Sequence, residues 1–145
     1  MARAAVLVAV AALAAASAAD GVVVPGLVSP SGNIHCVYAA RIDRRNQGSL
    51  LCTIGHARYS TELQHRCITR ATVDWHGWSL SPRGEGSVVC TGGVLWFGTP
   101  RYVRVAYGRD WHAGPYTCHS ALTGVTCLNR ARHGLFVSRA SWRVW

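Results

Sequence analysis

The chain contains six cysteines, and their spacing indicates which chemical roles they can have. Thiolates could hold a zinc ion, a thiol pair could carry out redox chemistry, or disulfides could brace the fold. A cysteine zinc site usually contains a Cys-x₂₋₄-Cys pair, and a thioredoxin-like redox site contains Cys-x-x-Cys. Neither spacing occurs in the chain, so the cysteines predict structural disulfides.

The segment GPYTCHSALTGVTCLN, residues 114–129, indicates how one disulfide would form. A Thr-Gly turn signal separates Cys118 from Cys127. If the two cysteines lie opposite each other in a hairpin, Leu122 and Thr123 form its tip. Directly opposed strand positions bring Cβ atoms to about 4.5–5.5 Å, and modest adjustment gives the distance of a disulfide.

The other four cysteines are expected to form two more bridges. Cys36 and Cys52 fall in consecutive predicted strands joined by a polar loop, which favours their pairing by the same argument. Elimination then joins Cys67 to Cys90, although six cysteines allow fifteen connectivities. In the chain-entropy treatment, each loop of this size stabilises the folded state by roughly 3 kcal/mol.

Seven histidines could serve as acids, bases or metal ligands, but they are scattered: there is no His-Glu-x-x-His, no His-x-His and no Gly-x-Ser-x-Gly nucleophile turn. A ribonuclease-like site would need a carboxylate, a histidine and an arginine around a phosphate. Chance alone could supply such a set from Glu62 or Glu85, His56 or His133, and Arg139. We therefore assign no catalytic residue, no metal site and no cofactor from the sequence.

Arginines provide a better candidate for a functional site, namely a surface that binds anionic partners. Alternation in a predicted strand over residues 134–144 places Arg139 and Arg143 on the solvent face. Arg104 faces outward in a predicted strand over residues 101–107. Guanidinium groups suit carboxylates and phosphates, so the three arginines would form one patch if these strands were neighbours.

Two further residues complete this candidate surface, and one alternative competes with it. Trp111 lies in a Gly-, Asp- and His-rich segment and is the best candidate for an exposed aromatic platform. His133 lies at a turn before the last strand and could be a polar member of the surface. In the alternative, Arg139 is architectural and pairs inward with Asp74 or Asp110.

Short β-strands are the elements expected to position these residues. Apolar, β-branched and aromatic runs alternate with Gly, Pro, Asn and Ser, which is typical of an antiparallel all-β sandwich or barrel. Only residues 57–68 could form a helix, and residues 20–32 are read as an apolar arm. The expected strands span residues 34–40, 49–54, 72–80, 87–91, 101–107, 115–120, 125–129 and 134–144.

Alternation also predicts which side chains face the core. Trp96 and Trp142 are expected to pack inside, whereas the terminal Trp145 is expected to fray. The predicted core faces of the two arginine-bearing strands carry Val103, Val105 and Tyr107 in the first, and Phe136, Ala140, Trp142 and Val144 in the second.

The first twenty residues, MARAAVLVAVAALAAASAAD, have the pattern of a secretory signal peptide. Arg3 precedes an apolar run and an Ala-x-Ala site, and the run is too short to cross about 30 Å of hydrocarbon. Cleavage after Ala18 or Ala19 would leave residues 20–145 as one secreted domain, in which no later stretch could span a membrane.

The charge of the chain is strongly positive. Fifteen arginines and no lysine stand against six acidic residues, which gives +9. Such a charge attracts anionic partners. A cell-wall polymer or another envelope protein would fit, and nucleic acid is possible without specific support. The competing interpretation is that arginine without lysine reflects a GC-rich genome.

Several short motifs lie along the chain between residues 29 and 142. They are SPSGNIHC (29–36), Tyr107-Gly108, GPYTCHS (114–120), GVTCLN (124–129) and RHGLFVSRASW (132–142). These motifs resemble those of a family of small exported actinobacterial proteins of unknown function, although Arg132 replaces a glycine of the family pattern and Trp142 replaces its usual tyrosine. The resemblance implies a disulfide-bonded, β-rich secreted domain, and it implies no activity.

The sequence therefore favours a secreted, cationic, disulfide-stabilised binding or interaction module of the cell envelope that is not an enzyme. The alternatives are a small secreted hydrolase acting on nucleic acid or glycan, and an inhibitor of an exported hydrolase. An enzyme should bring histidines and carboxylates together in a pocket. A binding module should present an open surface of arginine and tryptophan.

Overall fold

The computed structural model describes residues 22–40, 48–93 and 98–145. The predicted signal peptide and Trp96 lie outside these residues. The described part consists of eleven strands and one helix. No helix within it is both long and apolar enough to cross a membrane.

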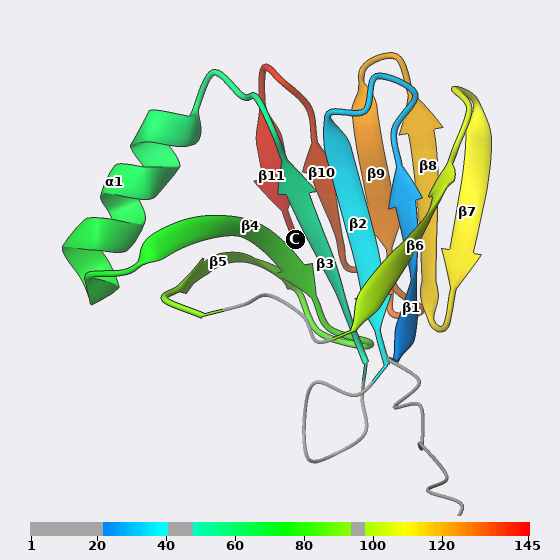
Figure 1. Ribbon diagram of the computed structural model, residues 1–145, viewed down its shortest axis with the longest axis horizontal. Coiled ribbons are helices and arrows are strands. Elements are labelled where there is room, and N and C mark those ends of the chain that lie inside the picture. Colours follow the sequence, from blue (N-terminus) through cyan, green and yellow to red (C-terminus); the bar gives the residue numbers. More distant parts are fainter. Residues whose placement is uncertain (1–21, 41–47, 94–97) are drawn as a thin grey trace, which may run out of the picture.

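Six strands form the first sheet, in the order β5-β4-β3-β2-β1-β6. Their bounds are Val23–Val28 (β1), Ile34–Ala39 (β2), Ser49–Ile54 (β3), Asp74–Leu80 (β4), Gly86–Thr91 (β5) and Thr99–Arg104 (β6). Neighbouring strands run antiparallel except β1 and β6, which are parallel. The sheet ends at β5 on one side and at β6 on the other (Figure 1).

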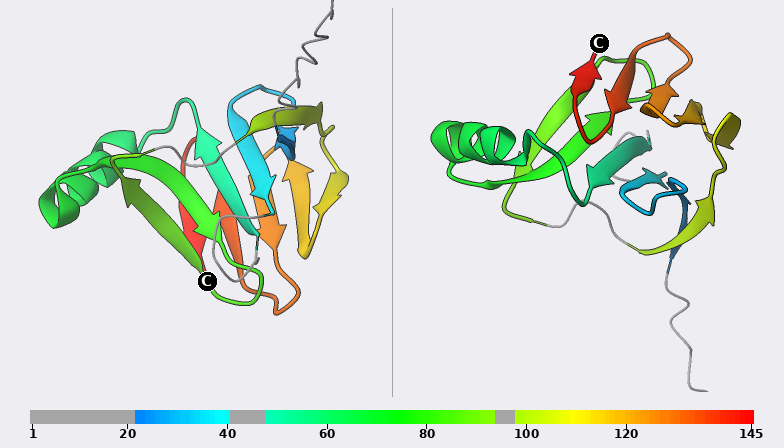
Figure 2. Two further views of the ribbon diagram at one scale, coloured as in Figure 1. Left: turned by 60° about the horizontal axis from the view of Figure 1, so that its bottom comes forward. Right: turned by 90° about the horizontal axis from the view of Figure 1, so that it is seen from above.

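Five antiparallel strands form the second sheet, in the order β11-β10-β9-β8-β7. Their bounds are Arg109–Ala113 (β7), Tyr116–Ala121 (β8), Gly124–Leu128 (β9), Gly134–Val137 (β10) and Trp142–Val144 (β11). The two sheets lie face to face, as Figure 2 shows. The prediction of an all-β sandwich or barrel with at most one short helix is confirmed, and the described residues form a sandwich. Among their strand pairs, β1 and β6 alone are not antiparallel.

Two of the predicted disulfides lie at the centre of the sandwich. Cys36 and Cys52 are directly opposite each other on β2 and β3, and Cys118 and Cys127 are opposite each other on β8 and β9. The sulfurs of Cys36, Cys52 and Cys127 all lie within 4.8 Å of one another, so the two bridges stack where the sheets meet. Because these sulfurs are oxidised, they do not offer thiolates to a metal.

The third disulfide holds the helix, and with it all three predicted pairings are confirmed. Helix α1 (Ser60–Ala71) lies beside the β4–β5 end of the first sheet (Figure 1). Its fully buried residues, Leu63 and Cys67, are one turn apart and face the sheet. Cys67 is bonded to Cys90 of β5. The helix begins and ends three residues later than the expected 57–68.

Tyr59 connects the start of the helix to the second sheet. Its hydroxyl donates a hydrogen bond of 2.6 Å to the backbone oxygen of Ser138, and burial raises the pKa of Tyr59 to about 12. The ring also packs edge-on against Trp75 and Trp78. The contact therefore joins α1 and β4 to the end of β10.

The predicted single strand over residues 134–144 is wrong, because the chain reverses between β10 and β11. The backbone N–H of Ser138 donates to the oxygen of Ser141, while the Ser138 hydroxyl accepts from the N–H groups of Ala140 and Ser141. This serine turn ends β10. As a result Phe136 lies opposite Arg143, on the same face of the sheet, and not on the opposite face as alternation had suggested.

Two segments that were not expected to be strands contain them: the apolar arm over residues 20–32 and the Gly-, Asp- and His-rich segment around Trp111, called the Trp111 loop here. The arm contains β1, which pairs with β2 and β6, and the loop contains β7, which pairs with β8. Trp111 is only 9% exposed, opposite Cys118, so its expected exposure is wrong. Conversely, β6 is an edge strand with Val103 55% exposed and Tyr107 beyond it 43% exposed, although both were expected to be buried.

Candidate binding surface

The predicted three-arginine patch does not form. Arg104 ends β6 in the first sheet, and Arg143 lies on β11 in the second. Arg104 donates hydrogen bonds to the backbone oxygens of Pro30 (2.6 Å) and Ser29 (3.2 Å), and so braces the β1–β2 turn. The two strands belong to different sheets, which the sequence alone did not reveal.

The alternative inward role of Arg139 is not observed either. Arg139 is exposed in the turn between β10 and β11, and no ion pair joins it to a carboxylate within the described part of the chain. Asp74 accepts a hydrogen bond from Gln64, and Asp110 pairs with His119. Both carboxylates proposed as partners of Arg139 are thus engaged elsewhere.

His133 is half-buried and holds a turn through its backbone. Its N–H donates to the Asn129 side-chain oxygen, and its carbonyl oxygen accepts from the Asn129 N–H. The Asn129 amide also donates to the backbone oxygens of Ser81 and Gly84 in the β4–β5 turn. The contacts between His133 and Asn129 are made by the His133 backbone and hold the turn between β9 and β10.

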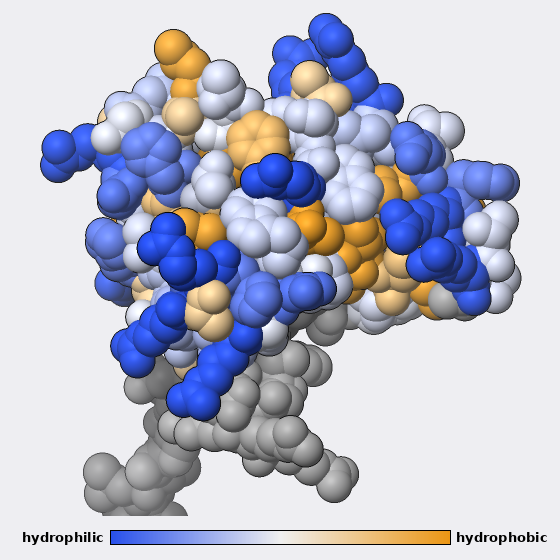
Figure 3. Space-filling view, turned by 180° about the vertical axis from the view of Figure 1, so that it is seen from behind, coloured by the Kyte–Doolittle hydropathy of each residue, from blue (hydrophilic) through white to orange (hydrophobic). Residues whose placement is uncertain are grey.

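A row of five side chains crosses the outer face of the second sheet. Asp110 is opposite His119, and His119 is opposite Thr126. Thr126 is in turn opposite Phe136, and Phe136 is opposite Arg143. Opposed residues share a face with Cβ atoms about 4.5–5.5 Å apart, so the row is continuous from β7 to β11. Figure 3 looks onto this face, where blue residues lie around areas of white and orange ones.

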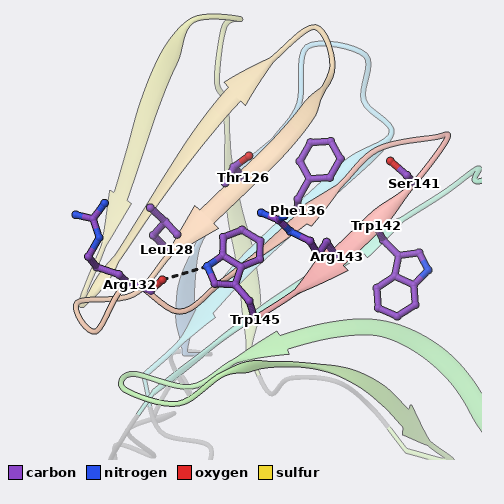
Figure 4. Close-up of a pocket in the computed structure, with 8 residues that line it drawn as sticks. All are labelled: Thr126, Leu128, Arg132, Phe136, Ser141, Trp142, Arg143 and Trp145. Atoms are coloured by element: carbon purple, nitrogen blue, oxygen red, sulfur yellow. Dashed lines mark hydrogen bonds between the residues drawn. The ribbon is translucent and has the colours of Figure 1, made fainter.

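The β9–β11 end of this face is hollowed into a groove of about 680 Å³. Leu128, Thr126 and Phe136 line it, and so do Arg132 and Arg143, of which Arg143 lies between Phe136 and Trp145 in Figure 4. The guanidinium carbon of Arg143 lies 4.5 Å from the ring centre of Trp145. The groove thus combines two cations with apolar and aromatic side chains.

Trp145 is firmly held, so the expectation that it frays is wrong. Its backbone exchanges hydrogen bonds with Gly134 (3.0 and 2.9 Å), and its oxygen also accepts from Gly86. Its indole Nε1 donates to the backbone oxygen of Arg132 at 3.1 Å (Figure 4). A Cβ on Gly134 would approach the indole to 2.6 Å and Leu128 to 2.8 Å, so glycine provides the space that the ring occupies.

Sequence reasoning found Arg143 but missed its companions Arg132, Phe136 and Trp145. The signal that could have located them is the pair of serines at 138 and 141, which suits a serine turn. Had the strand been broken there, alternation counted from the turn would have placed Phe136, Arg143 and Trp145 on one face.

Asp110 and His119 are the one histidine–carboxylate contact within the described residues. The His119 Nδ1 lies 2.7 Å from the Asp110 Oδ1, and both side chains are about half exposed, at 51% and 50%. A neighbouring contact joins the His112 Nδ1 and the Thr117 hydroxyl at 3.0 Å. The carboxylate orients His119 so that its Nε2 stays available to a ligand.

The ribonuclease-like sets considered from the sequence are not assembled. Within the described residues, no hydrogen bond or ion pair joins the side chains of Glu62 or Glu85 to those of His56, His133 or Arg139. The groups of three potential metal ligands found there comprise only disulfide cysteines.

A second hollow, of about 330 Å³, lies at the end of the sandwich where several turns meet. It is lined by residues of the SPSGN segment, by Tyr107, by residues 121–125 and by residues 138–140. The Asn33 amide accepts from the His56 N–H at 2.8 Å and donates to the His56 oxygen at 3.0 Å, and the Ser29 hydroxyl accepts from the Ile34 N–H. These polar groups bond to the backbone, as expected for a turn that is architectural.

His35 gives the fold a dependence on pH. It lies on β2 edge-on to Tyr102 at 5.1 Å, and burial, with a smaller effect of the Arg104 charge, lowers the pKa of His35 below 6.5. The unfolded chain therefore takes up this proton more readily than the folded one, and stability is lost as pH falls from 6.5 through the folded pKa.

We accordingly expect the urea midpoint to fall between pH 7.5 and pH 5, with part of the fall due to His35. Replacing His35 with Gln should make the midpoint less sensitive to pH over this interval. An unchanged pH dependence in His35→Gln would show that other groups cause the loss.

Comparison with curated proteins finds no match, and comparison with solved structures finds none. Comparison with protein families does find one, and it covers nearly the entire chain. The model described as "Family of unknown function (DUF6636)" matches residues 4–144, and the chain therefore belongs to this family of unknown function.

Proposed function

We propose that this protein is exported and works as a non-catalytic binding module for an anionic polymer of the cell envelope. Its binding surface is the outer face of the β7–β11 sheet. The observation that carries the proposal is the open groove lined by Arg132 and Arg143 together with Phe136 and Trp145. Of the arginine and tryptophan surface expected from the sequence, Arg143 alone lines this groove, and the combination of cations with aromatic rings supports binding of an anionic ligand.

Export is supported by the redox state of the cysteines. The three disulfides leave no free thiol, and such bridges persist in oxidising, extracytoplasmic environments. The N-terminal sequence has the charged, apolar and small-residue regions of a signal peptide. A protein exported in this way would meet the anionic polymers of the envelope.

Charge supports the choice of ligand. The chain carries +9 overall, and removal of the leader with Arg3 would leave +8. Beyond that general attraction, Arg143 is stacked on Trp145, and Leu128 and Phe136 line the groove. Cations beside apolar surface suit a polymer that carries both charge and carbon-rich faces.

A cosedimentation experiment with insoluble cell-wall sacculi tests this function. We expect the purified protein to bind and the bound fraction to fall as sodium chloride is raised, because salt screens charge pairs. The double variant Arg132→Gln with Arg143→Gln should bind at least about tenfold more weakly, since a hydrogen bond to a charged group contributes about 1.5–3 kcal/mol.

The matched control removes two arginines elsewhere. Arg66 and Arg70 are exposed on α1, and Arg66→Gln with Arg70→Gln changes the net charge by the same amount. Equal losses in the two double variants would mean that net charge alone drives binding and that the groove is not the site. Absence of binding by the unaltered protein would contradict the function itself.

The Asp110–His119 contact favours one second candidate, a hydrolase acting on glycan or nucleic acid. A carboxylate-oriented histidine can act as a general base or acid. Turnover of such a polymer by the purified protein, abolished in His119→Gln, would support this candidate. Binding without turnover would leave the binding module as the function.

A further inference from the structure

The groove offers more than charge, because Arg143 stacks its guanidinium on an aromatic ring. Its guanidinium lies 4.5 Å above the Trp145 ring, and Phe136 is directly opposite it on β10. In Figure 4 the arginine extends between the two aromatic rings. Trp145 is itself fixed by backbone hydrogen bonds to Gly134 and by its indole N–H.

Such a stack restricts the plane of the guanidinium, and the N–H groups lie at the edge of that plane. The paired N–H groups of a guanidinium, called the fork here, can donate two parallel hydrogen bonds to one carboxylate or phosphate. Because the stack orders the arginine before the ligand binds, less conformational entropy is lost on binding. Lysine could provide the same charge without this geometry. The site is therefore suited to one planar or tetrahedral anionic group at a defined position.

The lining of the groove indicates what must be attached to that anion. Leu128 and Phe136 offer carbon surface in the groove, and Thr126, opposite Phe136, offers a hydroxyl. The Trp145 ring lies between the two arginines of the groove (Figure 4). The C–H face of a sugar ring packs well on such side chains, while its hydroxyls can bond to threonine. A bare anion chain, such as polyphosphate, would leave the carbon surface uncovered.

We propose that this groove is the subsite for one anionic sugar residue of a glycan. Its carboxylate or phosphate lies on Arg143, its ring lies over Leu128 and Phe136, and the next anionic residue lies towards Arg132. This inference rests on the proposed function and specifies its ligand class. Carboxylated and phosphorylated glycans share the required chemistry, and the experiment distinguishes them.

Titration calorimetry at one ionic strength tests the subsite with five probes. Two are acidic glycans: oligogalacturonate, which carries carboxylates on sugar, and a sugar-substituted teichoic acid, which carries phosphates. The other three are neutral dextran, inorganic polyphosphate and a single-stranded oligonucleotide. We expect one or both acidic glycans to bind at least about tenfold more tightly than polyphosphate per anionic group, and dextran to bind weakest. The preferred acidic glycan then identifies the anionic group.

Arg143→Lys, with Arg66→Lys as its matched control, tests the fork. The first should weaken binding of the acidic glycan about tenfold without changing the melting temperature, because charge stays but the paired hydrogen bonds and the stack are lost. The control should bind as the unaltered protein does. Phe136→Ala should weaken glycan binding while leaving polyphosphate binding unchanged.

Three results would overturn the inference. If polyphosphate binds as tightly as the glycans and Arg143→Lys has no effect, the groove binds its ligand through charge alone and the sugar subsite is wrong. The proposed function of binding an anionic polymer would still hold. If a single-stranded oligonucleotide binds more tightly than either glycan, the ligand class is wrong. If none of the anionic probes binds, and sacculi do not bind either, the proposed function fails as well.

Discussion

Reduction of the three disulfides is expected to unfold the protein at room temperature. They close loops with sequence separations of 16, 23 and 9 residues. Each loop of this size contributes roughly 3 kcal/mol in the chain-entropy treatment. Their combined contribution is comparable with the total stability of an ordinary domain, which is about 5–15 kcal/mol. Urea unfolding with and without a reductant measures the difference directly.

Removing the bridges one at a time should separate global from local effects. Cys118→Ala with Cys127→Ala removes a bridge at the centre of the sandwich, so the urea midpoint of the entire fold should fall. Cys67→Ala with Cys90→Ala should mainly release α1, so amide exchange in the helix should rise more than in the second sheet. The denatured, unreduced protein should show no reactive thiol, and two or more would contradict the three bridges.

The disulfides could be predicted because the deciding pattern is local. Cys118 and Cys127 lie on adjacent strands of one hairpin, so their spacing and the turn between them determine the pairing. The Cys36–Cys52 bridge follows the same rule across β2 and β3. The spacing of the cysteines could not reveal that the two bridges stack on each other, because this contact depends on how one sheet packs against the other.

The arginine surface could be predicted only in part, because it depends on long-range neighbours. Alternation correctly turned Arg143 outward, but it could not say that β6 and β11 belong to different sheets and that Arg104 lies far from it in the topology. Trp111 was misplaced for a related reason. Its polar neighbours resemble a loop, yet pairing with β8 makes the segment a strand and turns the indole inward.

Replacing Trp78 with Ala is expected to cause the largest loss of stability among single substitutions outside the disulfides. Trp78 is fully buried and packs at 5.2 Å from Trp75, 6.1 Å from Tyr59 and 6.1 Å from Trp142. These partners come from β4, from the start of α1 and from β11, so the indole joins both sheets and the helix. Truncating such an aromatic side chain costs about 3–5 kcal/mol.

Trp78→Phe is the matched variant, because the indole N–H of Trp78 has no hydrogen-bond partner among the described residues. Phenylalanine keeps an aromatic ring at the same place and removes a buried donor without breaking a hydrogen bond, so the variant should lose much less stability than Trp78→Ala. Urea unfolding, followed by near-ultraviolet circular dichroism of the tryptophans, compares the two. Equal losses in both variants would mean that the indole N–H contributes to stability through a contact of its own, and that ring packing alone does not account for the role of Trp78.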